Sequence, residues 1–154
     1  MRSIATATER NSVLGKPYRV TPTGKVVADS TWAKVNLVWV PFPEPLEAHG
    51  GCLAHRLLET QLGNVFTNLA DEKLWRLFHS FDGSYCVRRI RGASAISVHS
   101  WAAAFDFNAQ EKPLNADAPW PKEVLDVFRG HGFINGGQWK RRDWMHFEAR
   151  GVWP

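Results

Sequence analysis

At 154 residues, the chain can bury one hydrophobic core but is too short for several large domains. We therefore expect a single domain over residues 1–154, in which residues 1–25 form an irregular arm. Apolar residues make up 44% of the chain and charged residues 22%, as in an ordinary soluble globular protein. The formal charge of +4 favours anionic partners, such as nucleic acid, lipid headgroups or an acidic polymer of the cell envelope.

Sequence signals for export or membrane insertion are absent. No segment has the ~18–20 consecutive apolar residues of a membrane span, and the N-terminus lacks the apolar run of a signal peptide. We therefore expect a chain made in the cytoplasm, without stable membrane insertion. Its two cysteines, Cys52 and Cys86, form no C-x-x-C motif, and we expect both thiols to be free, as in a reducing compartment.

The first part of the chain predicts little regular structure. Residues 1–25 are polar, and their prolines and glycines favour an irregular path. A short strand is expected near residues 25–27. Residues 34–40 are mainly β-branched and aromatic, which predicts a strand, and the prolines at positions 41, 43 and 45 would end it.

The middle of the chain predicts helices. From residue 52 to about residue 70, apolar side chains recur at steps of three and four, which is typical of an amphipathic helix. Asp71 can start a second, short helix that carries Trp75 and Phe78. Residues 85–91 are expected to be extended.

The last third of the chain alternates strands, a loop and a helix. Residues 105–107 alternate in polarity like a strand, and residues 115–120 read as a loop. Residues 121–130 predict a compact helix with proline in the first turn and glycine at the end. Two glycines at 136–137 predict a turn, and residues 146–150 predict a final strand.

Two segments of this last third carry candidate metal ligands. Ser97-Val-His99-Ser-Trp101-Ala-Ala-Ala-Phe-Asp106 offers an imidazole and a carboxylate, and Asp143-Trp-Met-His146-Phe-Glu148 offers a second imidazole. Two histidines and one aspartate leave a tetrahedral Zn²⁺ one open position, and a further carboxylate could act on water there. The spacings alone are weak signals, and no H-E-x-x-H motif is present. Ordinary hydrogen bonds near a strand end are the alternative.

Taken together, the two segments resemble the zinc peptidases that cut peptidoglycan stem peptides. That family contains VanY-like D-alanyl-D-alanine carboxypeptidases, D-Ala-D-Ala dipeptidases and L-alanyl-D-glutamate endopeptidases, and its pattern is S-x-H-x-x-G-x-A-x-D followed by D/E-x-x-H. The resemblance runs from about Trp32 to the C-terminus. It implies an α+β fold in which a small antiparallel sheet packs with helices and the zinc site lies at the sheet.

The resemblance also implies a role for each matching residue. His99, Asp106 and His146 would bind Zn²⁺, and Asp143 would be the general base. The Tyr85-x-x-Arg88 segment matches the family's arginine, which binds the substrate carboxylate or polarises the scissile carbonyl.

Several of these assignments have alternatives. Arg89 and Arg91 compete with Arg88 for the role of the family's arginine. Ser97, Tyr85 and Trp139 are candidates for substrate binding, although Trp139 could equally pack beside the metal. Glu148 is a rival base that would share a face with His146 on a strand and could orient its imidazole.

The sequence Gly136-Gly-Gln-Trp139 and the His-Phe-Glu triplet resemble the L-alanyl-D-glutamate endopeptidases, many of which are phage endolysins. This branch implies that the partner is the bacterial peptidoglycan stem peptide, that nucleic acid is not a partner, and that the protein is a monomer. It would reach the cell wall through a holin-made hole. A D-Ala-D-Ala carboxypeptidase or dipeptidase on the same scaffold is the second interpretation. A metal-stabilised peptidoglycan-binding module without catalysis is the third.

The sequence departs from the family pattern at three positions. Ala102 replaces the motif glycine, which a negative φ would accommodate and a positive φ would make a source of strain. Gln138 and Asn135 replace the usual Asp and Trp, and we expect these changes to affect substrate fit rather than metal binding. Asp143 lies three residues before His146, which would put the two on opposite faces of a flat strand. We therefore predict a bend or bulge there.

Overall fold

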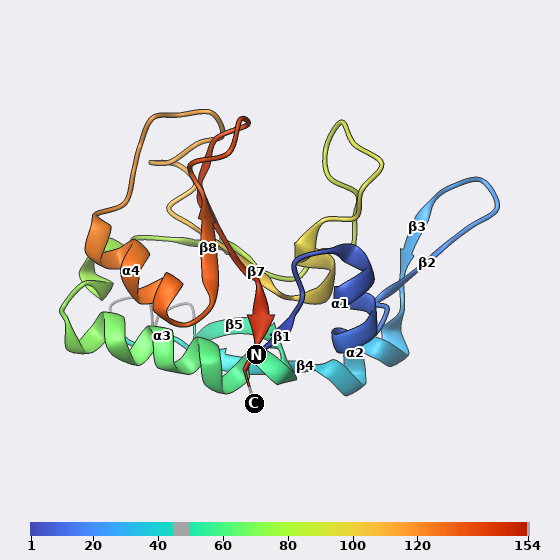
Figure 1. The fold of residues 1–154 in the computed structure, drawn as a ribbon, viewed down its shortest axis with the longest axis horizontal. Helices are drawn as coiled ribbons and strands as arrows, with labels where there is room; N and C mark the ends of the chain where they lie inside the picture. Colours follow the sequence, from blue (N-terminus) through green and yellow to red (C-terminus); the bar gives the residue numbers. More distant parts are fainter. Residues whose placement is uncertain (45–49, 154) are drawn as a thin grey trace.

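The computed structural model describes residues 1–44 and 50–153, and its centre is an antiparallel sheet of four strands. The strands follow the order β6 (Phe81–Gly83), β7 (Ala104–Phe107), β9 (Asp143–Ala149) and β8 (Phe133–Gly136). Helix α3 (Glu59–Asp71) contacts helix α4 (Lys122–Gly130), and α4 contacts β8 (Figure 1). The expected α+β class with a small antiparallel sheet and packed helices is confirmed.

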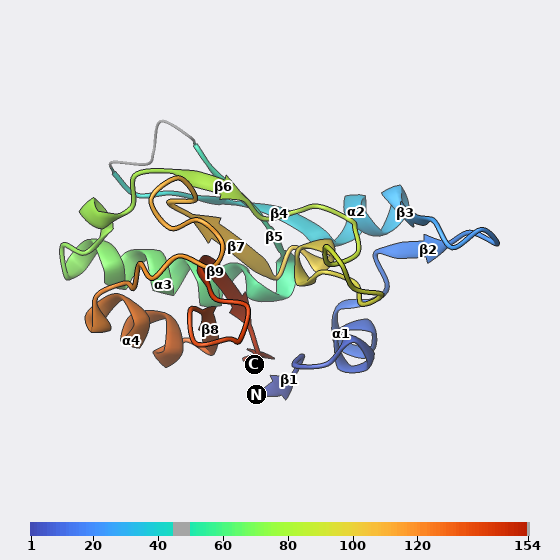
Figure 2. The same cartoon turned by 90° about the horizontal axis from the view of Figure 1, so that it is seen from above.

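Three antiparallel strand pairs complete the fold. Strand β4 (Leu37–Pro41) pairs with β5 (Gly51–His55), and α3 contacts β4. Strands β2 (Tyr18–Val20) and β3 (Val26–Ala28) form a hairpin that projects from the body of the protein (Figures 1 and 2). Strand β1 (Arg2–Ser3) pairs with β10 (Gly151–Val152), which brings the two ends of the chain side by side (Figure 2).

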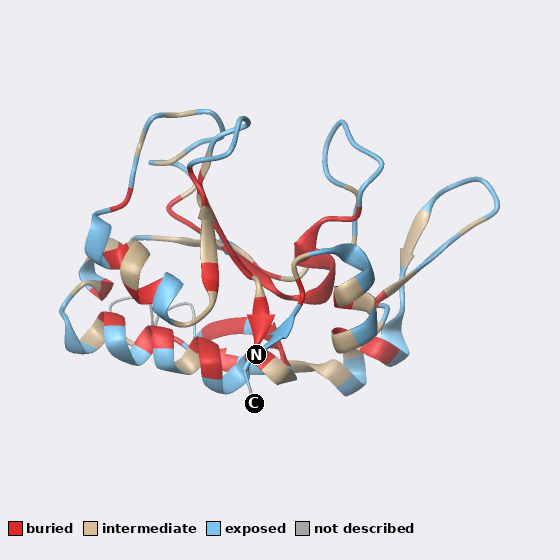
Figure 3. Ribbon diagram, in the orientation of Figure 1, coloured by how far each residue is buried: buried red, intermediate tan, exposed pale blue. Residues whose placement is uncertain are grey.

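The core between the sheet and the helices is rich in aromatic rings. Phe128 of α4 stacks on Phe147 of β9 at 3.8 Å between ring centroids, and Phe78 stacks on Trp120 at 4.6 Å. These side chains are almost completely buried, and burial of each contributes roughly 1.5–3 kcal/mol to stability. Figure 3 shows buried residues concentrated in the sheet and on the inner faces of the helices. This packing holds β7 and β9 in a fixed register.

The N-terminal residues contradict the expected irregular arm over residues 1–25. They contain β1, helix α1 (Ala7–Leu14) and β2. Thr6 caps α1 by accepting the backbone N–H of Glu9, while the Glu9 side chain accepts the N–H of Thr6, which forms a capping box. The Thr6-x-x-Glu9 pattern in the sequence indicates the start of a helix. The polar composition of the surrounding residues nevertheless led to the prediction of an irregular arm.

Two predicted boundaries were wrong. Residues 34–36 belong to helix α2 (Ser30–Asn36), which Asp29 caps, so the predicted strand begins only at Leu37. Residues 52–55 belong to β5 rather than to the long helix, which begins at Glu59 after a 3₁₀ turn, η2 (Arg56–Leu58). In β5, Cys52 and Ala54 are buried while Leu53 is exposed, which is the alternating burial of a strand. The spacing of the apolar residues in this segment also fits a helix, so the sequence pattern did not distinguish the two.

Two further segments are less regular than predicted. Only a 3₁₀ turn, η3 (Trp75–Leu77), follows α3. Residues 85–91 form no strand beyond one bridge from Arg89 to Ile96.

The strands predicted near residues 25–27 and at 105–107, the loop at 115–120 and the helix at 121–130 are confirmed. The strand predicted at 146–150 is β9, which begins earlier, at Asp143. The sequence did not predict β8, which ends at Gly136, so the predicted turn begins only at Gly137. Pro45 lies outside the described residues. Both cysteines are free, Cys52 buried and Cys86 exposed. No helix of the described part of the chain is long and apolar enough to cross a bilayer.

Candidate metal centre

His99 lies in a short 3₁₀ helix, η4 (Val98–Trp101), that leads into β7. The chain reverses at Ala102, which adopts a left-handed conformation with φ 49° and ψ 40°. A residue with a Cβ atom is disfavoured there by roughly 1–2 kcal/mol relative to the right-handed region. The buried alanine at the motif glycine is therefore strained, and the turn explains why the resembling family has glycine at this position.

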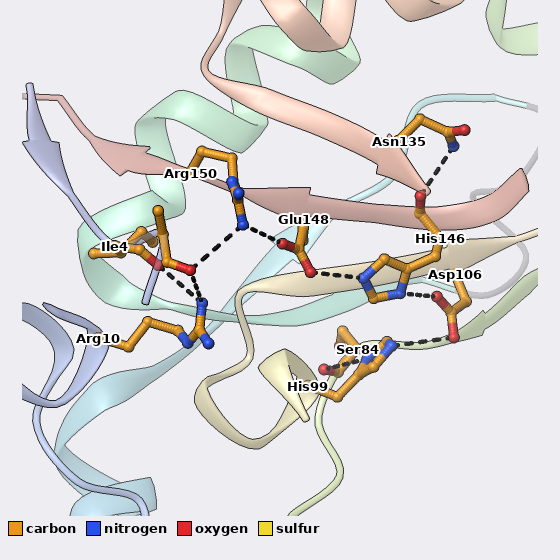
Figure 4. Close-up of polar contacts among 10 residues, drawn as sticks. Ile4, Arg10, Ser84, His99, Asp106, Asn135, His146, Glu148 and Arg150 are labelled. Atoms are coloured by element: carbon orange, nitrogen blue, oxygen red, sulfur yellow. Dashed lines mark hydrogen bonds and ion pairs between the residues drawn. The ribbon is translucent and has the colours of Figure 1, made fainter. Parts of the chain in front are cut away.

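Asp106 and His146 are directly paired across β7 and β9, so their side chains project from the same face of the sheet. The Oδ1 atom of Asp106 lies 3.0 Å from Nδ1 of His146, and its Oδ2 atom lies 3.2 Å from Nε2 of His99 (Figure 4). One ligand atom from each of the three residues lies within 4.8 Å of the other two. The structure thus brings together the three residues predicted to bind metal.

The remaining ring nitrogens have partners that orient both imidazoles. Nδ1 of His99 lies 3.1 Å from the carbonyl oxygen of Ser84, and Nε2 of His146 lies 3.1 Å from Oε2 of Glu148. Each of these nitrogens can donate its hydrogen to that oxygen, so Nε2 of His99 and Nδ1 of His146, which face Asp106, are the nitrogens whose lone pairs would face a bound ion once it displaces their protons. Two oriented neutral imidazoles and one carboxylate are a donor set that fits Zn²⁺.

The electrostatics of the centre favour a cation. Burial acts to raise the pKa of Asp106, but hydrogen bonds from His146 and His99 outweigh it and hold the pKa well below its ordinary value. Burial likewise acts against charge on His146, yet the hydrogen bonds to Asp106 and Glu148 raise its pKa to about 9. The same two carboxylates would stabilise a metal ion in place of a proton.

Strand β9 contains the predicted bulge. Asn135 of β8 pairs with Phe147, but the next residue of β8, Gly136, pairs with Asp143. The Asn135 side chain replaces part of the missing ladder, since its Nδ2 donates to the carbonyls of Trp144 and His146 at 2.9 Å each. Its Oδ1 accepts the N–H of Gly137 at 2.8 Å.

Asn135 also contacts the backbone of a candidate metal ligand, a contact that the expected effect on substrate fit did not include. Its only sequence signal was the departure from the family's Trp.

Asp143 and Glu148 both line the cavity of the centre, but they differ in their hydrogen bonding. Both oxygens of Glu148 are engaged, Oε2 with His146 and Oε1 with Arg150 at 3.0 Å. Oδ1 of Asp143 is buried and has no hydrogen-bond partner within the described residues. Burial raises the pKa of Asp143 above its ordinary value, which increases its basicity as a carboxylate. Of the two, Asp143 is the carboxylate that remains available for proton transfer.

A cavity of about 540 Å³ opens over these residues. Arg88 and Ser97 lie together on its wall, because the Ser97 N–H donates to the Arg88 carbonyl at 3.0 Å. The lining includes cationic, apolar and metal-site residues: Arg88, Ile90, Arg91, Ser97, Val98, His99, Asp106, Leu114, Trp139, Arg141, Asp143, Met145, His146 and Glu148.

Only some of the candidate substrate-binding residues line the cavity. Arg88 and Arg91 line it, whereas the Arg89 guanidinium donates to the carbonyls of Ser94 and Gly24 and is not part of the lining. Trp139 lines it with 40% of its surface exposed. Tyr85 is not part of the lining, because its ring stacks on Trp32 at the edge of the core. Tyr85, a candidate for substrate binding, therefore lies outside the cavity lining.

Residues 91–149 match the M15 peptidase family model described as D-alanyl-D-alanine carboxypeptidase. The matched segment contains the three metal-binding candidates and Asp143, and it begins after Arg88. The match covers less than half of the chain and is a likeness to this peptidase family over that segment. Searches of curated proteins and of solved structures found no match.

Proposed function

We propose that this protein is a zinc-dependent endopeptidase that cleaves the L-Ala–D-Glu bond of the peptidoglycan stem peptide, as a phage-type endolysin does. One observation carries the proposal of catalysis: Asp143 lines the same cavity as the three metal-binding candidates, and its Oδ1 is buried without a hydrogen-bond partner among the described residues. A site that only stabilised the fold would have no use for such a carboxylate. The family match independently supports a metallopeptidase.

The proposed roles follow from the positions of the side chains. His99, Asp106 and His146 hold the ion. When bound, Zn²⁺ supplies Lewis acidity that polarises the scissile carbonyl and makes a water molecule more acidic. Asp143 accepts the proton of the attacking water and passes it to the nitrogen of the leaving amine. Arg88, on the cavity wall, stabilises negative charge on the carbonyl oxygen.

The cavity wall suits an anionic peptide. Arg88, Arg91 and Arg141 line it, and none of them forms an ion pair with a carboxylate of the described residues, whereas Arg129, Arg142 and Arg150 do. Leu114 and Trp139 add partly exposed apolar surface to the same wall. Guanidinium groups without a carboxylate partner can bind the free carboxylates of a stem peptide by charge-assisted hydrogen bonds.

Two observations bear on the bond that is cut. The Gly136-Gly-Gln-Trp139 turn and the His-Phe-Glu triplet resemble the endolysin-type L-alanyl-D-glutamate branch and support the proposed bond. The description of the matching family model instead favours D-alanyl-D-alanine carboxypeptidase activity, which is the second candidate function. Both activities would use the same metal centre and differ in which peptide fills the cavity.

Mass spectrometry of purified muropeptides, incubated with the protein with and without a metal chelator, tests the proposal. We expect fragments with a new N-terminal D-Glu, which disappear with chelator and with the Asp143→Ala variant. Release of free D-Ala would instead establish the second candidate. A zinc-loaded protein that leaves every muropeptide intact would contradict both and leave the non-catalytic binding module.

A further inference from the structure

A chain of hydrogen bonds leads from the metal centre to the N-terminal residues. His146 contacts Glu148 at 3.1 Å, Glu148 contacts Nη1 of Arg150 at 3.0 Å, and the same Nη1 reaches the carbonyl of Ala5 at 3.4 Å (Figure 4). Arg10 approaches from the other side, and its Nη1 donates to the carbonyls of Ile4 and Ala5 at 2.9 and 3.1 Å. These hydrogen bonds thus link β9 with the segment between β1 and α1.

Glu148 is the central member of this chain. It lies two residues after His146 on β9, so both side chains project from the same face of the sheet. The residue is only 5% exposed, and each of its two oxygens has a different partner. A rotation of the carboxylate that broke the contact with Arg150 would also move the oxygen that accepts from His146. The orientation of the His146 imidazole ring therefore depends on Arg150.

Arg150 is itself held by residues distant in sequence. The Ile4 N–H donates to the Arg150 carbonyl at 3.1 Å, and the Arg150 N–H donates to the carbonyl of Gly132 at 2.9 Å. Arg10 lies over the ring of Trp101 at 5.0 Å and is buried, so the Ala5 carbonyl is fixed from both sides. The guanidinium of Arg150 thus approaches Glu148 from a backbone that is fixed by hydrogen bonds.

We propose that Arg150 is a positioning residue of the metal centre: through Glu148 it holds the His146 ring with Nδ1 directed at the metal. The proposal rests on the proposed zinc site, and it assigns to residues 4–10 a part in building that site. Hydrogen-bond partners of ligating histidines typically change metal affinity about 10–100-fold when they are removed. Arg150 is one step further from the ligand, so its effect must pass through Glu148.

The first test measures the zinc dissociation constant of the full chain by competition with a chromophoric chelator. Arg150→Met is expected to weaken zinc binding about tenfold, and Arg150→Lys to weaken it less. Arg142→Met is the matched control, because the Arg142 side chain is 44% exposed against 42% for Arg150, and Arg142 also forms a single ion pair, with Asp117. An Arg150→Met protein with the zinc affinity of the Arg142→Met control would overturn the proposal.

The second test asks whether Arg150 acts through Glu148. In a double-mutant cycle, Arg150→Met should have little further effect on zinc affinity once Glu148→Gln is present. Equal losses in both backgrounds would show that Arg150 acts independently of Glu148, and would refute the proposed path. If Arg150→Met fails to fold, as circular dichroism of the metal-free protein would reveal, the same cycle is run with Arg150→Lys.

These measurements need no turnover, so they are separable from the test of the proposed function. A protein that binds zinc through this path but cuts no muropeptide would contradict the proposed function and leave the positioning role intact. Muropeptide cleavage together with unchanged zinc affinity in the Arg150 variants would contradict the positioning role and leave the proposed function intact.

Discussion

At the scale of single residues, the contrast between Asp143 and Glu148 gives the sharpest expectation. Asp143→Ala should lower kcat by roughly 10²–10⁴-fold, because it removes the proton acceptor, while the three metal ligands remain. Zinc content measured on the same samples should stay at one ion per chain. Asp117→Ala, which removes an exposed carboxylate paired with Arg142, serves as the control with unchanged kcat. Activity that survives Asp143→Ala and is lost in Glu148→Ala would reverse the assignment.

His55 gives a prediction for stability against pH. The ring is buried, its Nε2 donates to the carbonyl of Leu14 at 3.0 Å, and its Nδ1 accepts the N–H of Leu57. Burial lowers its pKa from 6.5 to about 4. Between these two values the unfolded chain binds a proton that the folded chain does not, so stability is fully present above pH ~6.5 and falls as the pH falls towards 4.

Urea unfolding of the wild-type protein at pH 7 and pH 5 should therefore show a loss of about 2 kcal/mol from this residue. His55→Gln cannot titrate, and its loss between the same two pH values should be smaller by that amount. Equal losses in the two proteins would show that His55 does not resist protonation.

The residues of the metal site were more predictable than the residues that support them. His99, Asp106 and His146 belong to a motif whose chemistry restricts which side chains can stand there, so the motif pointed to all three. Asn135 and Arg150 act by hydrogen bonds to a backbone carbonyl and to a neighbouring carboxylate. Neither contact has a spacing rule, because each depends on which strands are neighbours. For Tyr85, proximity to Arg88 in the motif made it a candidate for substrate binding, whereas in the structure its ring packs against Trp32.

At the scale of elements, the β9 bulge sets the distance between Asp143 and the metal ligands. Asn135→Ala removes three hydrogen bonds that hold the bulge, and it should destabilise the protein by about 2–3 kcal/mol. It should also weaken zinc binding, because the His146 backbone loses a fixed contact. Urea unfolding and chelator competition measure the two effects. Asn64→Ala, on the exposed surface of α3, is the control, and a stability equal to that control would contradict the role given to Asn135.

The elements near the site were also easier to predict than those far from it. The last third of the chain has short elements separated by glycine, proline and polar loops, so local signals and tertiary structure agree. The bulge followed from one geometric requirement, that Asp143 and His146 serve the same site. The prediction of a helix for residues 52–55 was wrong because apolar residues at steps of three and four also occur in this segment, which is a strand. The sequence does not reveal that this strand pairs with β4. The prediction of an irregular arm for residues 1–25 was wrong because it followed from their polar composition and not from the capping box at Thr6.

At the scale of the whole molecule, the uneven distribution of cations predicts a charge preference. Arg141 lines the cavity and uses one nitrogen to bind the carbonyl of Arg91 at 3.0 Å, which leaves donors free for a substrate. We expect kcat/KM to be about tenfold or more higher for a stem peptide with a free carboxylate beside the cut than for its amide. Arg141→Gln should reduce this ratio, and Arg89→Gln, outside the cavity lining, should not. A ratio that is unaffected by Arg141→Gln would exclude this arginine from substrate recognition.

The pairing of β1 with β10 has a consequence for folding order. Arg2 and Val152 are neighbours in the structure although nearly the whole chain separates them in sequence, as is also true of Ala5 and Arg150. Bringing such distant segments together costs more loop-closure entropy than forming a hairpin or a helix, so we expect these contacts to form late. The helices and the β7–β9 pair can assemble first, with the surroundings of Glu148 still open. High-affinity metal binding would then be acquired at the last folding step, and its appearance in time would report that the chain has closed.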